Sequence, residues 1–195
     1  MIETVIDTAE LTKAAELVGP AMIGDPGFTA ILGGDDPQEE RTAVRFFEAV
    51  FHHLPGELVS IRGDGGLLGV LRRIRWPDCQ LSREEGQRIA PILYEVLQER
   101  VSLLGERSRV WAKHEPRMPH WHLAPMAVAP AHQGQGVGSE LLDWFCNNAD
   151  ADKLPGYLET SKIENMRLYE RFGFVVQAEA DAIGVPHWFM WREPR

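Results

Sequence analysis

Apolar residues recur at helical spacing through the first third of the chain, interrupted by turn signals. Residues 36–39, Asp-Pro-Gln-Glu, supply an N-cap residue and a first-turn proline, so a helix is predicted from here. Its apolar face is Val44, Phe47, Phe51 and Leu54, before Pro55-Gly56 ends it. An earlier helix is predicted from Asp7 or Thr8 to about Val18, where Gly19-Pro20 ends it. Residues 24–36 contain five Gly and Pro residues and are predicted to form a loop.

The middle of the chain predicts a hairpin and one more helix. Residues 57–62 and 67–74 are strand-like and flank Gly63-Asp64-Gly65-Gly66, a good hairpin turn. Residues 82–85, Ser-Arg-Glu-Glu, have the sequence of a capping box. The helix behind it has an apolar face made of Ile89, Ile92, Leu93, Val96 and Leu97. Residues 105–119 are polar and irregular, which predicts a loop that faces substrate.

The last third alternates strands and helices. A strand is predicted over 121–128, then a glycine-rich loop, and then a helix whose apolar side begins at Val137. The next strand covers 157–159. A second capping box at 161–164 opens a short helix that ends at Phe172-Gly173, and strands over 174–178 and 186–191 finish the chain. This order predicts an α/β fold with a mixed sheet.

Composition narrows the class of protein. The 195 residues, 44% of them hydrophobic, suit one compact domain over 1–195. A formal net charge of −9 argues against nucleic acid or an anionic membrane as partner. The two cysteines, Cys79 and Cys146, cannot form a secreted disulfide framework, and neither lies in a C-x-x-C motif. With no leader-like N-terminus and no long apolar run, a cytoplasmic protein is expected.

The glycine-rich loop, residues 133–138, is the most informative segment. A strand that leads into glycines and then a helix start is an anion site, because free N–H groups and the helix dipole converge there. Residues 131–148 contain no Lys or Arg, so backbone amides are expected to hold a phosphate with little side-chain charge. A dinucleotide fingerprint is one alternative, with Glu159 as the ribose acid. However, the glycines are spaced G-x-G-x-G, and fewer than forty residues remain after Glu159. A plain tight turn is the other alternative.

The pattern Gln133-x-x-Gly136-x-Gly138 resembles the pyrophosphate loop of the GNAT superfamily of N-acetyltransferases. Residues 126–130 resemble the family's fourth strand and the loop after it, and Asn165 with 168–174 resembles its second signature. Residues 119–193 are also similar to the puromycin N-acetyltransferases within that superfamily. The resemblance implies a GNAT-type fold with splayed central strands, an acetyl-CoA-binding core over 119–193 and an acceptor-side half over 1–110.

The resemblance also assigns roles to residues. The backbone of Met126 and Val128 is expected to pair with pantetheine, and Tyr169 to protonate the departing CoA thiolate. Asn165 either binds the cofactor or an ordered water, or is a polar residue of the first helical turn. The complete expected cofactor-binding set is Met126, Ala127, Val128, Gln133, Gly134, Gln135, Gly136, Val137, Gly138, Ser139, Asn165 and Tyr169.

The general base is less clearly indicated. His120 and His122 share one face of the 121–128 strand, and a neutral imidazole there is either the base or a positioning group. Glu115 and Glu159 are reserves. His120-x-His122 with His114 or Glu115 has a spacing that permits a metal, but no metal is expected because the CoA signature already accounts for this strand. Neither cysteine is expected to carry the acyl group.

The predicted function is transfer of an acetyl group from acetyl-CoA to an amine, expected to be that of a small molecule, in a ternary complex. The alternatives are a catalytically silent CoA-binding or regulatory module and an acyltransferase that uses another acyl-CoA. The acceptor and a homodimeric state stay open. Aromatic candidates for the acceptor pocket, each equally suited to the core, are Trp76, Trp111, His114, Trp121 and Trp188.

Overall fold

A single twisted sheet with helices on both faces forms the molecule. The computed structural model describes residues 2–4, 7–34 and 36–195. The strands, in the spatial order β1-β2-β3-β4-β5-β7-β6, are β1 (Ile2–Thr4), β2 (Glu57–Gly63), β3 (Gly66–Arg75), β4 (Trp121–Val128), β5 (Gly156–Thr160), β7 (Val185–Arg192) and β6 (Val175–Ala182). Within the described ranges β4 and β5 are the parallel neighbours, and the other pairs are antiparallel. The mixed α/β prediction is confirmed.

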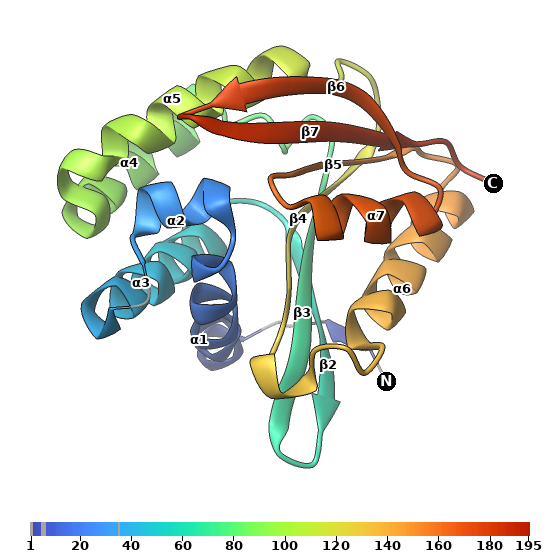
Figure 1. Cartoon of the computed structure of the whole chain (residues 1–195), viewed down its shortest axis with the longest axis horizontal. Coiled ribbons are helices and arrows are strands. Elements are labelled where there is room, and N and C mark those ends of the chain that lie inside the picture. The colour runs from blue at the N-terminus through green and yellow to red at the C-terminus, as the bar shows by residue number, and fades with distance from the viewer. Residues whose placement is uncertain (1, 5–6, 35) are drawn as a thin grey trace.

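The helices divide between the two faces of the sheet. They are α1 (Thr8–Ile23), α2 (Pro26–Leu32), α3 (Pro37–His53), α4 (Arg83–Leu97), α5 (Val101–His114), α6 (Val137–Ala151) and α7 (Ile163–Arg171), with short 3₁₀ turns η1 (Gln98–Arg100) and η2 (Pro130–His132). In Figure 1, α1, α2 and α3 lie on one side of β3 and β4, and α6 and α7 lie on the other. None of these helices, within the described residues, combines the length and apolarity needed to cross a bilayer.

Two buried clusters hold the layers together. Because side chains alternate along a strand, Leu58 and Val70 pack with α1 and α3, whereas Val59 and Leu71 pack with α6. Each fully buried aliphatic side chain of this kind stabilises the fold by roughly 1.5–3 kcal/mol. The sheet is therefore anchored on both faces.

Several local predictions are confirmed. Asp36 caps α3, Ser82 and Glu85 form the capping box of α4, and β4 covers the predicted residues 121–128. In the capping box, the Glu85 N–H donates to Ser82 Oγ at 3.2 Å and the Ser82 N–H donates to Glu85 Oε2 at 2.9 Å. These capping residues lie within a few positions of the backbone N–H groups that they bind, so the spacing of residues along the sequence is enough to predict them.

The predicted end of the first helix at Gly19-Pro20 is wrong. Helix α1 continues to Ile23 with Pro20 inside it. Gly19 is buried where α1 crosses α3, and a Cβ there would lie 2.7 Å from the backbone nitrogen of Val44. The glycine is thus needed for close helix packing, and that packing carries the helix through its proline.

Two predicted loops contain helices. Residues 26–32 form α2, whose N-cap Asp25 accepts from the N–H groups of Gly27 and Phe28 at 3.0 and 3.2 Å, with Pro26 in the first turn. Residue 35 of that predicted loop lies outside the described residues. The substrate-facing loop over 105–119 is wrong as well, because α5 extends to His114. Its polar composition conceals a spaced face, Leu104, Arg107 and Trp111, that turns inward.

The second predicted capping box is also wrong. Helix α7 begins after Lys162, and no side chain caps it. Ser161 instead donates from its hydroxyl to Asp25 Oδ1 at 2.6 Å and accepts from the Gly27 N–H at 3.1 Å. A contact between segments more than 130 residues apart therefore takes the hydroxyl that the local pattern assigned to the helix.

The central strands diverge as predicted. β4 and β5 pair only at Trp121–Gly156 and His122–Tyr157, and beyond this point β4 pairs with β3 alone. The register between β3 and β4 shifts opposite Ala124-Pro125, which confirms that Pro125 interrupts the strand at an irregularity. The rest of β4 consequently has one open edge.

Candidate active site

The glycine loop turns the chain from β4 into α6. Gly134 and Gly136 have φ of +74° and +91°, a region that other residues rarely adopt, and Gly136 is the N-cap of α6. No side chain caps this helix, so its first N–H groups are left to bind an anion. The side chains of Gln133 and Gln135 donate to the carbonyls of Val128 at 3.2 Å and Ala131 at 2.9 Å, and so brace the loop.

A groove of about 510 Å³ runs from this loop to α7. Its lining includes most of the expected cofactor residues: Met126, Ala127, Val128, Gln133, Gly134, Gly136, Gly138, Ser139, Asn165 and Tyr169. Gln135 and Val137 do not line it, since Gln135 bonds the loop and Val137 packs in the core. The groove also contains Lys162 and Arg171. The start and the end of α7 thus bring to the groove two cations that the loop itself lacks.

The open edge of β4 borders the groove. The Ala129 N–H donates to the carbonyl of Leu68 on the β3 side at 2.9 Å. Because backbone groups alternate in direction along an extended strand, those of Met126 and Val128 point the opposite way, toward the open edge. The Met126 amide is therefore directed at any extended ligand in the groove, while the Val128 carbonyl accepts from Gln133.

A second, apolar cavity of about 320 Å³ meets the groove at its inner end. The two share Met22, Asp25, Met126, Asn165 and Tyr169. Its apolar wall comes mainly from α2–α5 and includes Phe28, Phe46, Phe47, Val50, Leu93, Leu104 and Trp111. Its polar lining includes Arg107, His122, Glu159, Ser161 and His187. The molecule thus has two compartments, one polar and one apolar, with Tyr169 at their junction.

Tyr169 is held by packing. Its side chain is buried, and its ring lies 6.0 Å from that of Phe174. Burial, with a smaller contribution from the charge of Asp25, raises the pKa of the phenol above its ordinary value. Tyr169 therefore stays protonated at physiological pH and can act as a proton donor between the compartments.

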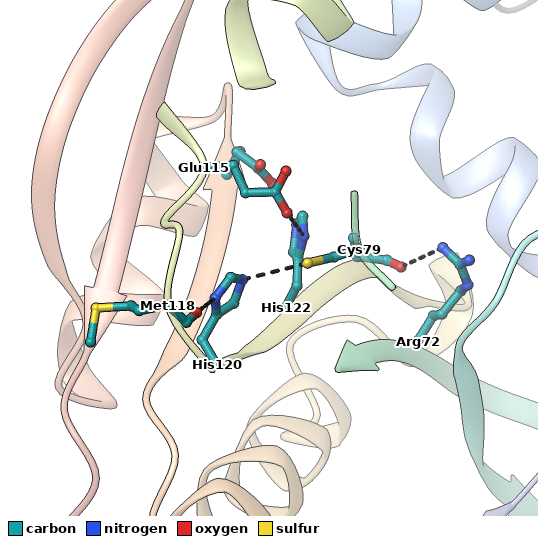
Figure 2. Close-up of polar contacts among 8 residues, drawn as sticks. Arg72, Cys79, Glu115, Met118, His120 and His122 are labelled. Carbon is teal, nitrogen blue, oxygen red and sulfur yellow. Dashed lines mark hydrogen bonds and ion pairs between the residues drawn. The ribbon is translucent and has the colours of Figure 1, made fainter. Parts of the chain in front are cut away.

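His122 lies between two carboxylates. Its Nδ1 is 3.7 Å from Glu115 Oε1, as Figure 2 shows for these two residues. Its Nε2 is 2.8 Å from Glu159 Oε2. Burial lowers the pKa of His122, but the charge of Glu159 and the contacts with Cys79 and Glu115 raise it, and the net pKa stands well above the ordinary histidine value. The imidazolium is consequently favoured at neutral pH, and the neutral imidazole expected of a base is the minor form.

His120 lies deeper than His122 on the same face. Its Nδ1 is 2.7 Å from the carbonyl oxygen of Met118, which only accepts, so Nδ1 carries the proton. Its Nε2 is directed at Cys79 Sγ at 3.7 Å (Figure 2). Burial is the main cause that lowers the pKa of His120 below the ordinary histidine value, so the ring is neutral at pH 7. His122 and Cys79 line the apolar cavity and His120 does not.

Comparisons with known proteins agree with this geometry. Residues 92–176 match the family model described as the acetyltransferase (GNAT) domain. The matched segment carries β4, the glycine loop, α6, β5 and α7, and is similar to that domain. An uncharacterized N-acetyltransferase of Schizosaccharomyces pombe is 38% identical over 78 residues, which cover 38% of this chain and 32% of that protein. This chain therefore spans about a third of the length of that relative.

Solved structures match the GNAT fold over the whole chain. A Corynebacterium glutamicum structure described as histone acetyltransferase HPA2 and related acetyltransferase has a TM-score of 0.74 at 23% identity, covering 100% of this chain and 96% of that one. The structure of yncA from Salmonella typhimurium with its cofactor acetyl-CoA has a TM-score of 0.55 at 15% identity, covering 100% and 94%. Neither is a puromycin N-acetyltransferase, so that narrower likeness stays a prediction.

Sequence reasoning missed a group of residues that supports this candidate site. Arg107 is 4% exposed, lies between the rings of Phe28 and Trp111, and donates to the Gly27 carbonyl at 3.3 Å. Burial lowers its pKa to about 10, so it stays charged at neutral pH. Two signals, Asp25 ahead of Pro26 and the spaced inner face of α5, pointed to the elements that carry this group.

The aromatic residues predicted as candidates for the acceptor pocket lie in different places in the structure. Trp111 lines the apolar cavity. Trp121 lies under the Arg73 guanidinium at 4.2 Å, and His114 stacks on Phe189 at 4.3 Å. Trp76 and Trp188 are also absent from the described lining of the cavity. Four of the five candidates therefore lie outside the lining of this cavity.

Proposed function

We propose that this protein is a GNAT-type acetyltransferase, which transfers the acetyl group of acetyl-CoA to the amine of a small molecule in a ternary complex. The observation that carries the proposal is the meeting of two compartments at Tyr169, Met126 and Asn165. One has an uncapped helix start with Lys162 and Arg171 nearby, which suits a pyrophosphate. The other is apolar and has carboxylates in its lining, which suits an amine with an apolar body.

The donor is placed with its pyrophosphate at the start of α6 and its pantetheine along the open edge of β4. The backbone N–H of Met126 is proposed to hydrogen-bond this chain and to polarise the thioester carbonyl as negative charge develops on its oxygen. Asn165, which lines both compartments, is proposed to fix the thioester end. Support for acetyl-CoA as donor comes from the family match and the acetyl-CoA-bound relative.

Proton transfers complete the reaction. The neutral amine nitrogen attacks the carbonyl carbon, the C–S bond breaks, and the thiolate takes the proton of Tyr169. The proton that the nitrogen loses on becoming an amide then returns to the Tyr169 phenolate. An amine with a pKa about 3 units above neutral costs roughly 4 kcal/mol to deprotonate at pH 7, so a base on the acceptor side is needed. The His122–Glu159 pair is proposed for this, with the Glu159 carboxylate as the acceptor because His122 favours its charged form. His120, behind the cavity wall, is a positioning residue in this scheme.

The acceptor is proposed to enter through the apolar cavity, which is built mainly by residues 1–110. Asp25 and Glu159 favour the cationic form of an approaching amine, and the phenylalanines of α2 and α3 favour an apolar body. A cavity of about 320 Å³ is at the small end of ligand sites, which is why a small molecule is proposed over a protein tail.

Calorimetry and a thiol-release assay test the proposal. Acetyl-CoA is titrated into the purified chain, and a panel of aromatic amines, polyamines and lysine peptides is then screened for release of free CoA. Binding with turnover of at least one small amine is expected. Failure to bind millimolar acetyl-CoA would refute the donor. Binding without turnover of any amine would identify the silent CoA-binding module, and a higher kcat/KM with propionyl-CoA would identify another acyl donor.

A further inference from the structure

Beside the acceptor cavity, four side chains of metal-binding type converge. We infer that Cys79, Glu115, His120 and His122 form a binding site for a zinc-type divalent cation. Each offers one ligand atom, and the four atoms lie within 4.8 Å of one another. They come from the segment after β3, the end of α5 and the start of β4, as Figure 2 shows. Acetyl transfer as proposed above does not require this site.

The distances suit a tetrahedral cation. Cys79 Sγ lies 3.7 Å from His120 Nε2, and His122 Nδ1 lies 3.7 Å from Glu115 Oε1. Metal–ligand bonds of about 2.0–2.3 Å in a tetrahedron place neighbouring ligand atoms roughly 3.3–3.8 Å apart. These two pairs already have the tetrahedral spacing, and any pair at the 4.8 Å limit must approach by about 1–1.5 Å to complete the geometry.

The outer nitrogens of both histidines are already engaged. His120 donates Nδ1–H to the Met118 carbonyl at 2.7 Å, and His122 directs Nε2 at the Glu159 carboxylate at 2.8 Å. Zinc-bound histidines characteristically donate their second N–H to a carbonyl or a carboxylate, which orients the ring. Both inner nitrogens, His120 Nε2 and His122 Nδ1, then face the centre of the cluster.

Unsatisfied polar atoms gather at this point. His122 Nδ1 and Glu115 Oε1 are buried without a hydrogen-bond partner, as is the hydroxyl of the neighbouring Tyr157. The Glu115 and Glu159 side chains are 11% and 3% exposed, so two carboxylates are buried around one histidine. A cation bound at His122 Nδ1 takes the place of the proton there and compensates the buried negative charge. It also gives His122 Nδ1 and Glu115 Oε1 the partner that each lacks.

The ligand set selects the metal. One thiolate, two imidazoles and one carboxylate suit zinc, whereas magnesium and calcium prefer oxygen ligands alone. A cation here would fasten the Cys79 segment to β4 at the wall of the acceptor cavity. His122 would keep its Nε2–H on Glu159, and the proposed proton acceptor would stay available.

The test is metal binding by the complete chain in the absence of CoA, because the CoA thiol itself binds zinc. Chelator-treated protein is titrated with zinc against a competing chromophoric chelator, and bound metal is counted by mass spectrometry. One equivalent is expected. Since changes in outer-shell partners alone typically cost 10–100-fold in affinity, loss of the ligand in Cys79→Ser should cost about 100-fold or more. Cys146→Ser is the matched control, because Cys146 is buried on α6 away from the cluster.

Two further readouts separate ligation from folding. His120→Asn retains a donor for the Met118 carbonyl but removes the inner nitrogen, and it should also weaken zinc binding. Zinc should protect Cys79 from alkylation, and cobalt should give a thiolate charge-transfer band that Cys79→Ser loses. Unchanged acetyl-CoA affinity would show that each variant is folded. Zinc binding below stoichiometry in the natural chain, or equal affinity in Cys79→Ser, overturns the site. Absent acetyl transfer with intact zinc binding refutes the proposed function alone.

Discussion

A phenol at the junction of the two compartments is the residue on which the proposed chemistry depends most. Tyr169→Phe keeps the ring against Phe174 and removes only the hydroxyl. General acids typically contribute 10²–10⁴-fold, so kcat should fall by about 100-fold or more, while the Kd of acetyl-CoA stays unchanged. Steady-state kinetics and calorimetry measure the two quantities. An unaltered kcat would remove Tyr169 as the acid.

Lys162 is a second residue with a measurable role. It lines the groove from the start of α7, where it can reach a phosphate that the cation-free glycine loop cannot neutralise by side chains. Lys162→Ala should raise the KM for acetyl-CoA by about 3–10-fold, or roughly 1 kcal/mol, and leave kcat at saturation unchanged. The effect should shrink at high salt. Lys13→Ala, on the exposed side of α1, is the control and should change neither value.

At the level of elements, α1 and α3 cross closely beside the apolar cavity. A helical Gly→Ala change ordinarily stabilises by about 0.5–1 kcal/mol. At Gly19 the new Cβ would meet the Val44 backbone at 2.7 Å, so Gly19→Ala should instead lower the free energy of unfolding. Gly86→Ala, on α4 with its nearest neighbour at 3.6 Å, should show the ordinary increase. Urea unfolding of both variants compares them. Stabilisation by both changes would contradict the close crossing.

For the whole molecule, the pH dependence of stability reflects how its last strand is attached. Arg192 on β7 is 4% exposed and donates two bonds of 2.7 Å to Asp150 at the end of α6. The hydrogen bonds from Arg192, and then that from the Arg195 amide, hold the pKa of Asp150 below its ordinary value. A carboxyl group whose pKa is lower in the folded chain stabilises the folded state at pH values above its unfolded-state pKa near 4. This stabilisation is lost as the pH falls through the folded-state pKa.

Asp150→Asn should therefore lower the free energy of unfolding by about 1.5–3 kcal/mol at pH 7. The gap between variant and natural chain should narrow as the pH falls below about 4. Denaturant titrations at several pH values measure it. Asp143→Asn makes the same charge change at an exposed position of α6 and should have little effect at any pH. A gap that is constant with pH would show that Asp150 acts by packing alone.

The sequence by itself determined the order of most strands and helices and the glycine loop that precedes α6. Asp36, Ser82 and the glycines of 133–138 act on groups within about five positions along the chain, so spacing reveals them. The family resemblance of the glycine loop and of the segment around Asn165 also predicted the splayed strands. Pro125 marks the irregularity within β4 itself.

The tertiary structure alone decided what surrounds that loop. Lys162 and Arg171 reach the groove from α7, Ser161 bonds Asp25 across 136 positions, and Cys79 meets His120 across 41. Such contacts depend on how the strands splay and the helices cross, and no local spacing encodes them. For this reason the glycine loop followed from the sequence, whereas the apolar cavity and the metal-type cluster became visible only in the folded chain.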